Sequence, residues 1–392
     1  MPETSLNQFT TFKATLDQHG VDTALAQLTD SLRASGKYHE LFEALKMQVR
    51  RSLGLPITYS DLGDDLGEAE QTALQDGLLT ACREVGMALL STGRVREGWM
   101  YLQPVGDKRA VAEKLSELTP HEENLDEFVE VALYENVDPA RGYGLVLEHY
   151  GTCNAITTLE NLAPGRDRAS TRIPISLLVR HVHTELSRSL RADITQQQGT
   201  EPQETTLAAL VADRDWLFGE YSYHLDTSHL ASTIRLARSG DDPDILHLAL
   251  DLTAYGTKLN AQFQYPGEPP FEDLYPAHAL YFSALLGERV DEALNYFREQ
   301  AEGTDVHQIG TAVAEVYIDL LSRIQRYDDA IEAWIEMVPA GAHTSGLAPG
   351  LLELAEKGGR FQRLVDHFQQ REDLLAYATG LMQATLHDQS SA

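Results

Sequence analysis

The apolar positions of this chain recur three and four residues apart, as in an amphipathic helix, wherever a period is visible. Residues 25–49, 78–102 and 312–337 carry this spacing most clearly. Strand-like alternation of apolar and polar residues is nearly absent, and short breaks rich in Gly, Pro, Asp and Ser separate the apolar segments. The pattern therefore predicts an all-α chain.

One short sequence motif recurs within these helical segments. A turn is followed by an apolar residue, a small or apolar residue three positions later, and a large apolar residue four positions after that. Its five occurrences are Tyr38/Leu41/Leu45, Val95/Gly98/Leu102, Val290/Ala293/Phe297, Tyr327/Ala330/Trp334 and Phe361/Leu364/Phe368. The last three begin 37 and 34 residues apart, and a period near 34 is typical of helix–turn–helix arrays.

This motif and its period resemble those of the tetratricopeptide repeat family. Matches to the first-helix half of that family's pattern are Val85-Gly86 with Leu89, and Tyr143-Gly144 with Leu147. The second match leads into a sixth unit through Gly151, Cys153 and Ile156. The resemblance implies an α-solenoid, a right-handed superhelix of paired helices whose first helices line a concave groove.

The resemblance is uneven along the chain. Residues 1–160 and 265–392 fit as N-terminal and C-terminal tetratricopeptide-like segments, and the fit is clearest after Tyr275. Residues 161–264 are helical in pattern but fit the repeat poorly. Two arrangements stay open for this middle segment: irregular repeats that continue the solenoid, or an inserted helical bundle.

The charge of the chain narrows the possible partners. Its 392 residues include 60 acidic and 31 basic ones, giving a formal net charge of −29. Such a field repels phosphate groups, so we expect no binding to nucleic acid or to anionic membranes; a basic partner, or simple solubility in a salty cytoplasm, fits better. Since no long uncharged apolar stretch or signal peptide is visible, we expect a cytoplasmic protein.

The family resemblance also implies a function. The groove of such solenoids commonly holds a peptide segment of a partner, which implies a non-enzymatic protein–protein interaction scaffold without a cofactor. The groove positions carried over from the family are Arg83, Met87, Arg141, Leu145, His149, Tyr275, His278 and Phe282, with Glu315, Asp319 and Arg323 in the next unit. The oligomeric state stays open.

Histidines and carboxylates in the middle segment provide an alternative. His181 and Glu185 are four residues apart, as are Glu220 and His224, so each pair would share one face of a helix. These four residues have the composition of a divalent metal site in a helical bundle, and His229 is an alternative ligand. The alternative function is thus a metal-dependent enzyme or a small-ligand-binding protein, although no established metal-binding motif is present.

Overall fold

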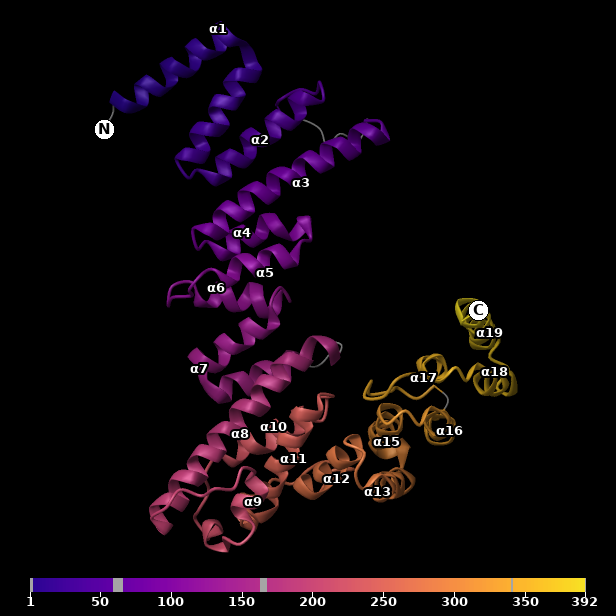
Figure 1. Cartoon of the computed structure of the whole chain (residues 1–392). Helices are drawn as coiled ribbons and strands as arrows, with labels where there is room; N and C mark the ends of the chain where they lie inside the picture. The colour runs from indigo at the N-terminus through magenta and orange to yellow at the C-terminus, as the bar shows by residue number, and fades with distance from the viewer. Residues whose placement is uncertain (1–2, 59–65, 163–167, 340, 392) are drawn as a thin grey trace. The chain divides into compact units, whose positions relative to one another are not determined.

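The computed structural model describes residues 3–58, 66–162, 168–339 and 341–391, which form helices and connecting turns without a β-strand (Figure 1). The all-α prediction is therefore confirmed for this part of the chain. Its residues group into two compact units, unit 1 (Met1–His149) and unit 2 (Tyr150–Ala392). None of the helices described is both long and apolar enough to span a membrane.

Unit 1 is a series of helices in which most pack against the next one in sequence (Figure 1). The elements are α1 (Glu3–Ala34), α2 (Tyr38–Ser52), α3 (Glu68–Ser91), α4 (Val95–Leu102), η1 (Gln103–Val105), α5 (Lys108–Ser116), α6 (Leu125–Val129), η2 (Glu130–Tyr134) and the start of α7 (Pro139–Leu162). The fully buried side chains of Leu41, Val85 and Leu89 form the centre of a core between α2 and α3.

Unit 2 contains the remaining helices. They are α8 (Arg168–Gln198), α9 (Leu207–Val211), η3 (Asp215–Phe218), α10 (Thr227–Ala237), α11 (Pro243–Lys258), η4 (Ala261–Phe263), α12 (Leu274–Leu285), α13 (Val290–Glu302), α14 (Val306–Ile309), α15 (Ala312–Arg323), α16 (Tyr327–Met337), α17 (Leu351–Gly358), α18 (Phe361–Gln370) and α19 (Leu374–Ser391). The predicted middle segment belongs to this unit, because α10 and α11 pack on α8 and α11 packs on α12.

The five occurrences of the recurring motif share one local structure. Each occurrence begins a helix at its first apolar residue; these helices are α2, α4, α13, α16 and α18. Just before them, a residue in the left-handed region ends the preceding helix: Gly36, Gly93, Gly287, Gln325 and Gly359. The amide of this residue donates to the carbonyl three positions back, and the next amide donates five positions back. This is a Schellman turn, which favours glycine, and Gln325 is the exception among the five.

Small residues allow the paired helices to approach closely. A Cβ atom on Gly98 of α4 would lie 2.9 Å from the Gly86 carbonyl oxygen of α3, closer than such atoms normally come. Ala293 and Ala330 occupy the corresponding positions in α13 and α16 and are fully buried. In α7 the expected turn is also present, because Gly151 has φ 80° and ψ 172° and interrupts the helix before Cys153.

Candidate binding sites

The predicted groove residues of unit 1 are only partly available to a partner. Arg83 is exposed on α3, and its guanidinium lies 4.0 Å from the Asp107 carboxylate. Met87 is half-buried and His149 is exposed, whereas Leu145 is buried. Arg83 is thus the cationic member of this set that remains open to a ligand.

Arg141, the other arginine among the predicted groove residues of unit 1, has a structural role. Its guanidinium donates a hydrogen bond of 2.5 Å to the Leu118 carbonyl oxygen. The guanidinium carbon also lies 5.6 Å from the centre of the Phe128 ring, a cation–π contact. These contacts hold the side chain against its own unit.

The predicted groove residues of unit 2 lie in the core. Tyr275, His278 and Phe282 are each at most 1% exposed, because α12 is covered by neighbouring helices. Gly256 of α11 packs against Tyr275, and a Cβ atom there would lie 2.3 Å from the ring. Tyr275 and Phe282 therefore contribute packing to the fold. His278 also lines a cavity between α10, α12 and α15.

The residues of the alternative metal site are dispersed. His181 pairs with Glu185 at 3.3 Å, whereas His224 pairs with Asp193 at 3.1 Å. His181 and Asp193 are twelve positions apart on α8, which corresponds to about 18 Å along a helix. In the part of the chain that the structure describes, no three His, Cys, Asp or Glu side chains are grouped to hold a metal ion.

The helix expected to place Glu220 beside His224 does not form. Residues 219–226 are a turn, and α10 begins only at Thr227. Asp226 explains this boundary, because its carboxylate accepts the Ser228 amide at 2.9 Å as an N-cap. Glu220 is exposed, and His229 lies on α10.

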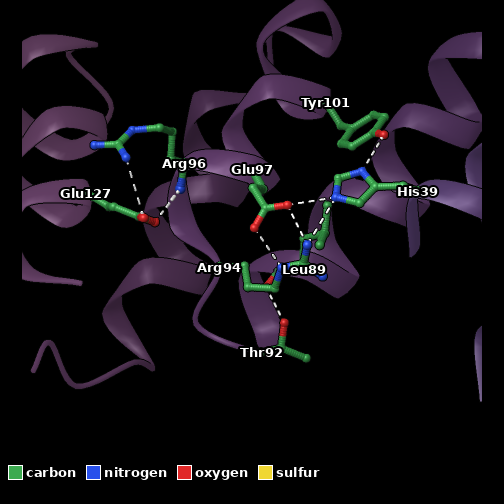
Figure 2. A network of polar contacts seen from close by, with 8 residues as sticks. All are labelled: His39, Leu89, Thr92, Arg94, Arg96, Glu97, Tyr101 and Glu127. Carbon is green, nitrogen blue, oxygen red and sulfur yellow. Dashed lines mark hydrogen bonds and ion pairs between the residues drawn. The ribbon is translucent and has the colours of Figure 1, made fainter. Parts of the chain in front are cut away.

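A polar network that the sequence patterns did not reveal connects α2 with α4 in unit 1. Figure 2 shows the His39 imidazole between Tyr101 and Glu97, with Nδ1 2.9 Å from the phenol oxygen and Nε2 2.7 Å from the carboxylate. Arg94 donates to the same carboxylate at 2.8 Å, and this hydrogen bond lowers the pKa of Glu97. The only local signal was the three-residue spacing of Arg94 and Glu97.

The same network extends from α4 to α6. The Glu127 carboxylate accepts the backbone amide of Arg96 at 3.0 Å, so it neutralises the N-terminal end of α4 (Figure 2). The Arg96 guanidinium bonds Glu130 at 2.6 Å. The partners lie on different helices of one unit, so we assign these contacts to holding α2, α4, α6 and η2 together.

A groove between α13, α15 and α16 has an acidic lining. We call it the acid-lined groove; its volume is about 310 Å³. Its charged residues are the acidic Asp291, Asp329, Glu332 and Glu336 and the basic Arg298 and Arg326, and its apolar or aromatic residues are Leu294, Tyr317, Leu321, Ala333 and Met337. Carboxylates thus outnumber guanidinium groups four to two.

The basic residues of this groove already have partners. Arg298 pairs with Glu302 at 2.7 Å, and Arg326 pairs with Asp329 at 2.5 Å. Asp291 and Glu336 are exposed and form no ion pair within the described residues. They are therefore available to a positively charged ligand.

A second cavity in unit 2 has the opposite character. We call it the arginine-lined cavity; its volume is about 440 Å³. Its polar lining includes Arg235, Arg238, Glu268 and His278, and its apolar lining includes Pro266, Pro269, Phe271, Leu274, Ala312, Val316 and Leu347. Arg235 lies in the last turn of α10, and Arg238 directly follows this helix, three residues later.

Aromatic stacking organises one wall of the arginine-lined cavity. The rings of Phe271 and His278 lie 4.1 Å apart at an interplanar angle of 24°, and the Arg238 guanidinium carbon lies 4.9 Å from the centre of the Phe271 ring. Contact through its flat face leaves the N–H groups at the edge of a guanidinium for other acceptors. Burial lowers the pKa of Arg238, and the charges of Arg168 and Arg323 act in the same direction.

His278 contributes an unused acceptor to this wall. The Leu274 carbonyl lies 2.7 Å from Nδ1, so Nδ1 carries the proton and Nε2 has a free lone pair. Nε2 is buried, with no hydrogen-bond partner in the described part of the chain. Burial lowers the pKa of His278 to about 3, helped by the charges of Arg238 and Arg235, so the ring is neutral near pH 7.

A buried carboxylate near the cavity pairs with a different arginine, Arg168. Asp319 is 4% exposed; it accepts the Tyr281 hydroxyl at 2.8 Å and pairs with Arg168 at 2.7 Å. Arg323 donates to the backbone carbonyls of Arg238, at 2.6 Å, and Gly240. Arg238 has no carboxylate partner within the described residues.

The chain matches no protein-family model, and no curated protein is significantly similar to it. Function is therefore argued from the chemistry of the acid-lined groove and the arginine-lined cavity. Both sites contact α15, but they combine the same charged residue types in opposite proportions.

Proposed function

We propose that this chain is a non-enzymatic interaction scaffold that holds a basic segment of a partner protein in the acid-lined groove. The observation that carries the proposal is the pair of exposed carboxylates, Asp291 and Glu336, that line the groove and form no direct ion pair in the described part of the chain. The resemblance to tetratricopeptide repeats, the solenoid arrangement and a cytoplasmic location belong to the same proposal.

The chemistry of the groove fits Lys and Arg side chains. Their ammonium or guanidinium groups would pair with Asp291 and Glu336, while their aliphatic stems pack on Tyr317 and Met337. The net charge of −29 would attract such a segment from a distance, and the local carboxylates would determine where it binds.

The experiment must separate the groove from the overall field of the chain. Fluorescence anisotropy would follow a labelled Lys- and Arg-rich peptide binding to the full chain, to Asp291→Lys/Glu336→Lys, and to the control Glu201→Lys/Glu220→Lys. Both variants change the net charge equally, but Glu201 and Glu220 are exposed outside the groove. We expect about ten-fold weaker binding for the groove variant, equivalent to about 1.4 kcal/mol, and a much smaller loss for the control.

Equal losses in the two variants would mean that the general field binds the peptide, and the proposal would be wrong. A captured cellular partner that binds wild type and groove variant alike would lead to the same conclusion. Circular dichroism of both variants would check that each keeps its helical content.

A further inference from the structure

We propose that the arginine-lined cavity binds a small organic acid whose carboxylate contacts Arg238 and whose hydroxyl or N–H group donates to His278. This site is separate from the acid-lined groove and takes a ligand of opposite charge. Arg238, His278 and the apolar walls would make the contacts to the ligand.

The first observation is the charge that lacks a counter-ion. Arg168, Arg238 and Arg323 all lie within electrostatic range of the one carboxylate of Asp319. Arg168 pairs with this carboxylate directly, and Arg323 is bonded to backbone carbonyls. Among the described residues, Arg238 contacts the Phe271 ring and forms no ion pair, so a carboxylate in the cavity would supply an opposite charge in a two-pronged contact.

The remaining charged lining residues do not remove this surplus. Arg235 is exposed at the cavity and adds a second positive charge. Glu268 is exposed too, and no ion pair joins it to Arg235 or Arg238 in the described part of the chain. The charge near the cavity therefore favours an anion although the chain as a whole is acidic.

The second observation is the Nε2 atom of His278. It is a buried acceptor without a donor, and an unpaired buried polar atom costs free energy. Because the ring is neutral, it would not bind a carboxylate; it requires an O–H or N–H group. A ligand that carries both a carboxylate and a donor satisfies Arg238 and His278 together.

The third observation is the size and apolar character of the rest of the cavity. About 440 Å³ falls within the range of small-molecule sites, which run from about 300 to 1,000 Å³. Leu274, Val316 and Leu347 add apolar surface to the lining of the cavity. An organic body fills such space better than a bare inorganic anion does.

The cavity wall at Leu347 is held in place before any ligand binds. The buried Glu315 carboxylate accepts the amides of Ser345 at 2.6 Å and Leu347 at 2.8 Å. Arg168 donates to the Leu347 carbonyl at 3.2 Å. A wall fixed at both its N–H and C=O groups lowers the ordering cost of binding.

The test uses isothermal titration calorimetry on the full chain with benzoate, 4-hydroxybenzoate, inorganic phosphate and a capped Gly-Glu-Gly peptide. We expect 4-hydroxybenzoate to bind most tightly and benzoate more weakly, because benzoate lacks the donor. Arg238→Gln should weaken 4-hydroxybenzoate binding at least about ten-fold, since it removes a charge-assisted contact. The control Arg180→Gln removes an exposed arginine outside the cavity and should stay within about two-fold, as expected for a surface charge.

Two further variants keep the test decisive. Arg238→Lys retains the charge and should lose part of the affinity, which covers the case that Arg238→Gln does not fold. His278→Phe keeps an aromatic ring beside Phe271 and should abolish the preference for 4-hydroxybenzoate over benzoate. The proposal is overturned if neither organic acid binds wild type, if phosphate or the peptide alone binds, or if the Arg238 variants bind as wild type does.

Discussion

The acid-lined groove and the arginine-lined cavity lie on the same helix, α15, yet they differ in how their charges are paired. In the groove, Arg298 and Arg326 find carboxylates four and three residues away on their own helices, which leaves other carboxylates in surplus. At the cavity, Asp319 is paired with Arg168, 151 residues earlier in the chain, which leaves Arg238 in surplus. A net charge of −29 therefore does not predict the sign of a particular site.

Burial sharpens the same contrast. The groove carboxylates Asp291 and Glu336 are exposed, so water and salt screen them and they act mainly on the approach of a ligand. Asp319 and His278 are almost completely buried, so their interactions are stronger and their loss affects the fold itself. Three stability measurements follow from this difference, in order of decreasing effect.

The largest effect is expected from Asp319→Ala. This change leaves the buried Tyr281 hydroxyl without its acceptor and breaks the ion pair with Arg168, whose side chain is about half exposed. Together these losses should cost about 2–4 kcal/mol of unfolding free energy, most of it from the buried hydroxyl. The matched variant Asp329→Ala breaks the ion pair with Arg326, which is about half exposed, and should cost less than about 1 kcal/mol. Urea denaturation would measure both. If Asp329→Ala cost as much unfolding free energy as Asp319→Ala, burial of the carboxylate would not explain the difference between the two sites.

The next effect is the pH dependence contributed by His278. The pKa of His278 is lowered from 6.5 to about 3 in the folded chain. Between these two pH values, His278 is therefore protonated in the unfolded chain and neutral in the folded chain. The contribution of His278 to stability is full above pH 6.5 and falls as the pH drops from 6.5 towards 3. By pH 5 the loss should be about 2 kcal/mol.

Many carboxylates also titrate below pH 6, so the measurement is a difference. Denaturation midpoints of wild type and His278→Phe would be compared at pH 7.5 and pH 5. The variant should lose less stability than wild type over this interval. Parallel curves for the two proteins would show that His278 is not buried in its neutral form.

The smallest effect concerns the turn that leads into α16. Gln325 has φ 63°, a conformation that costs a non-glycine residue about 1 kcal/mol, and its side chain is exposed. Gln325→Gly should therefore raise the thermal midpoint slightly without altering any charge of the acid-lined groove, and peptide binding should be unchanged. A lower midpoint would mean that the Gln325 side chain stabilises this turn.

Much of the local structure was predictable. The recurring motif predicts where five helices begin, namely α2, α4, α13, α16 and α18. This works because a turn residue followed by an apolar residue specifies a helix start within a few positions. The interruption at Gly151 follows from the same local signal. The helix expected through Glu220 and His224 was wrong, because Asp226 caps a helix that begins after them.

The candidate sites were much less predictable. His278 was singled out as a groove residue, but neither its burial nor its unpaired Nε2 atom follows from its position on α12. Arg238 and Phe271 were not singled out, since a basic residue near a helix end and an aromatic residue in a loop are common. The contact between them joins α10 to the loop before α12, which no local pattern specifies.

The sequence by itself determined that the chain is helical, where its paired helices turn, and that its total charge is strongly negative. These properties depend on backbone preferences and on composition, which act over a few residues or over the whole chain. Only the tertiary structure decided which charges are neutralised, because Arg168 reaches Asp319 across 151 residues and leaves Arg238 facing the cavity. The sign of a binding site is set by such long-range pairing, since a charge acts on a ligand only after its own partners have been counted.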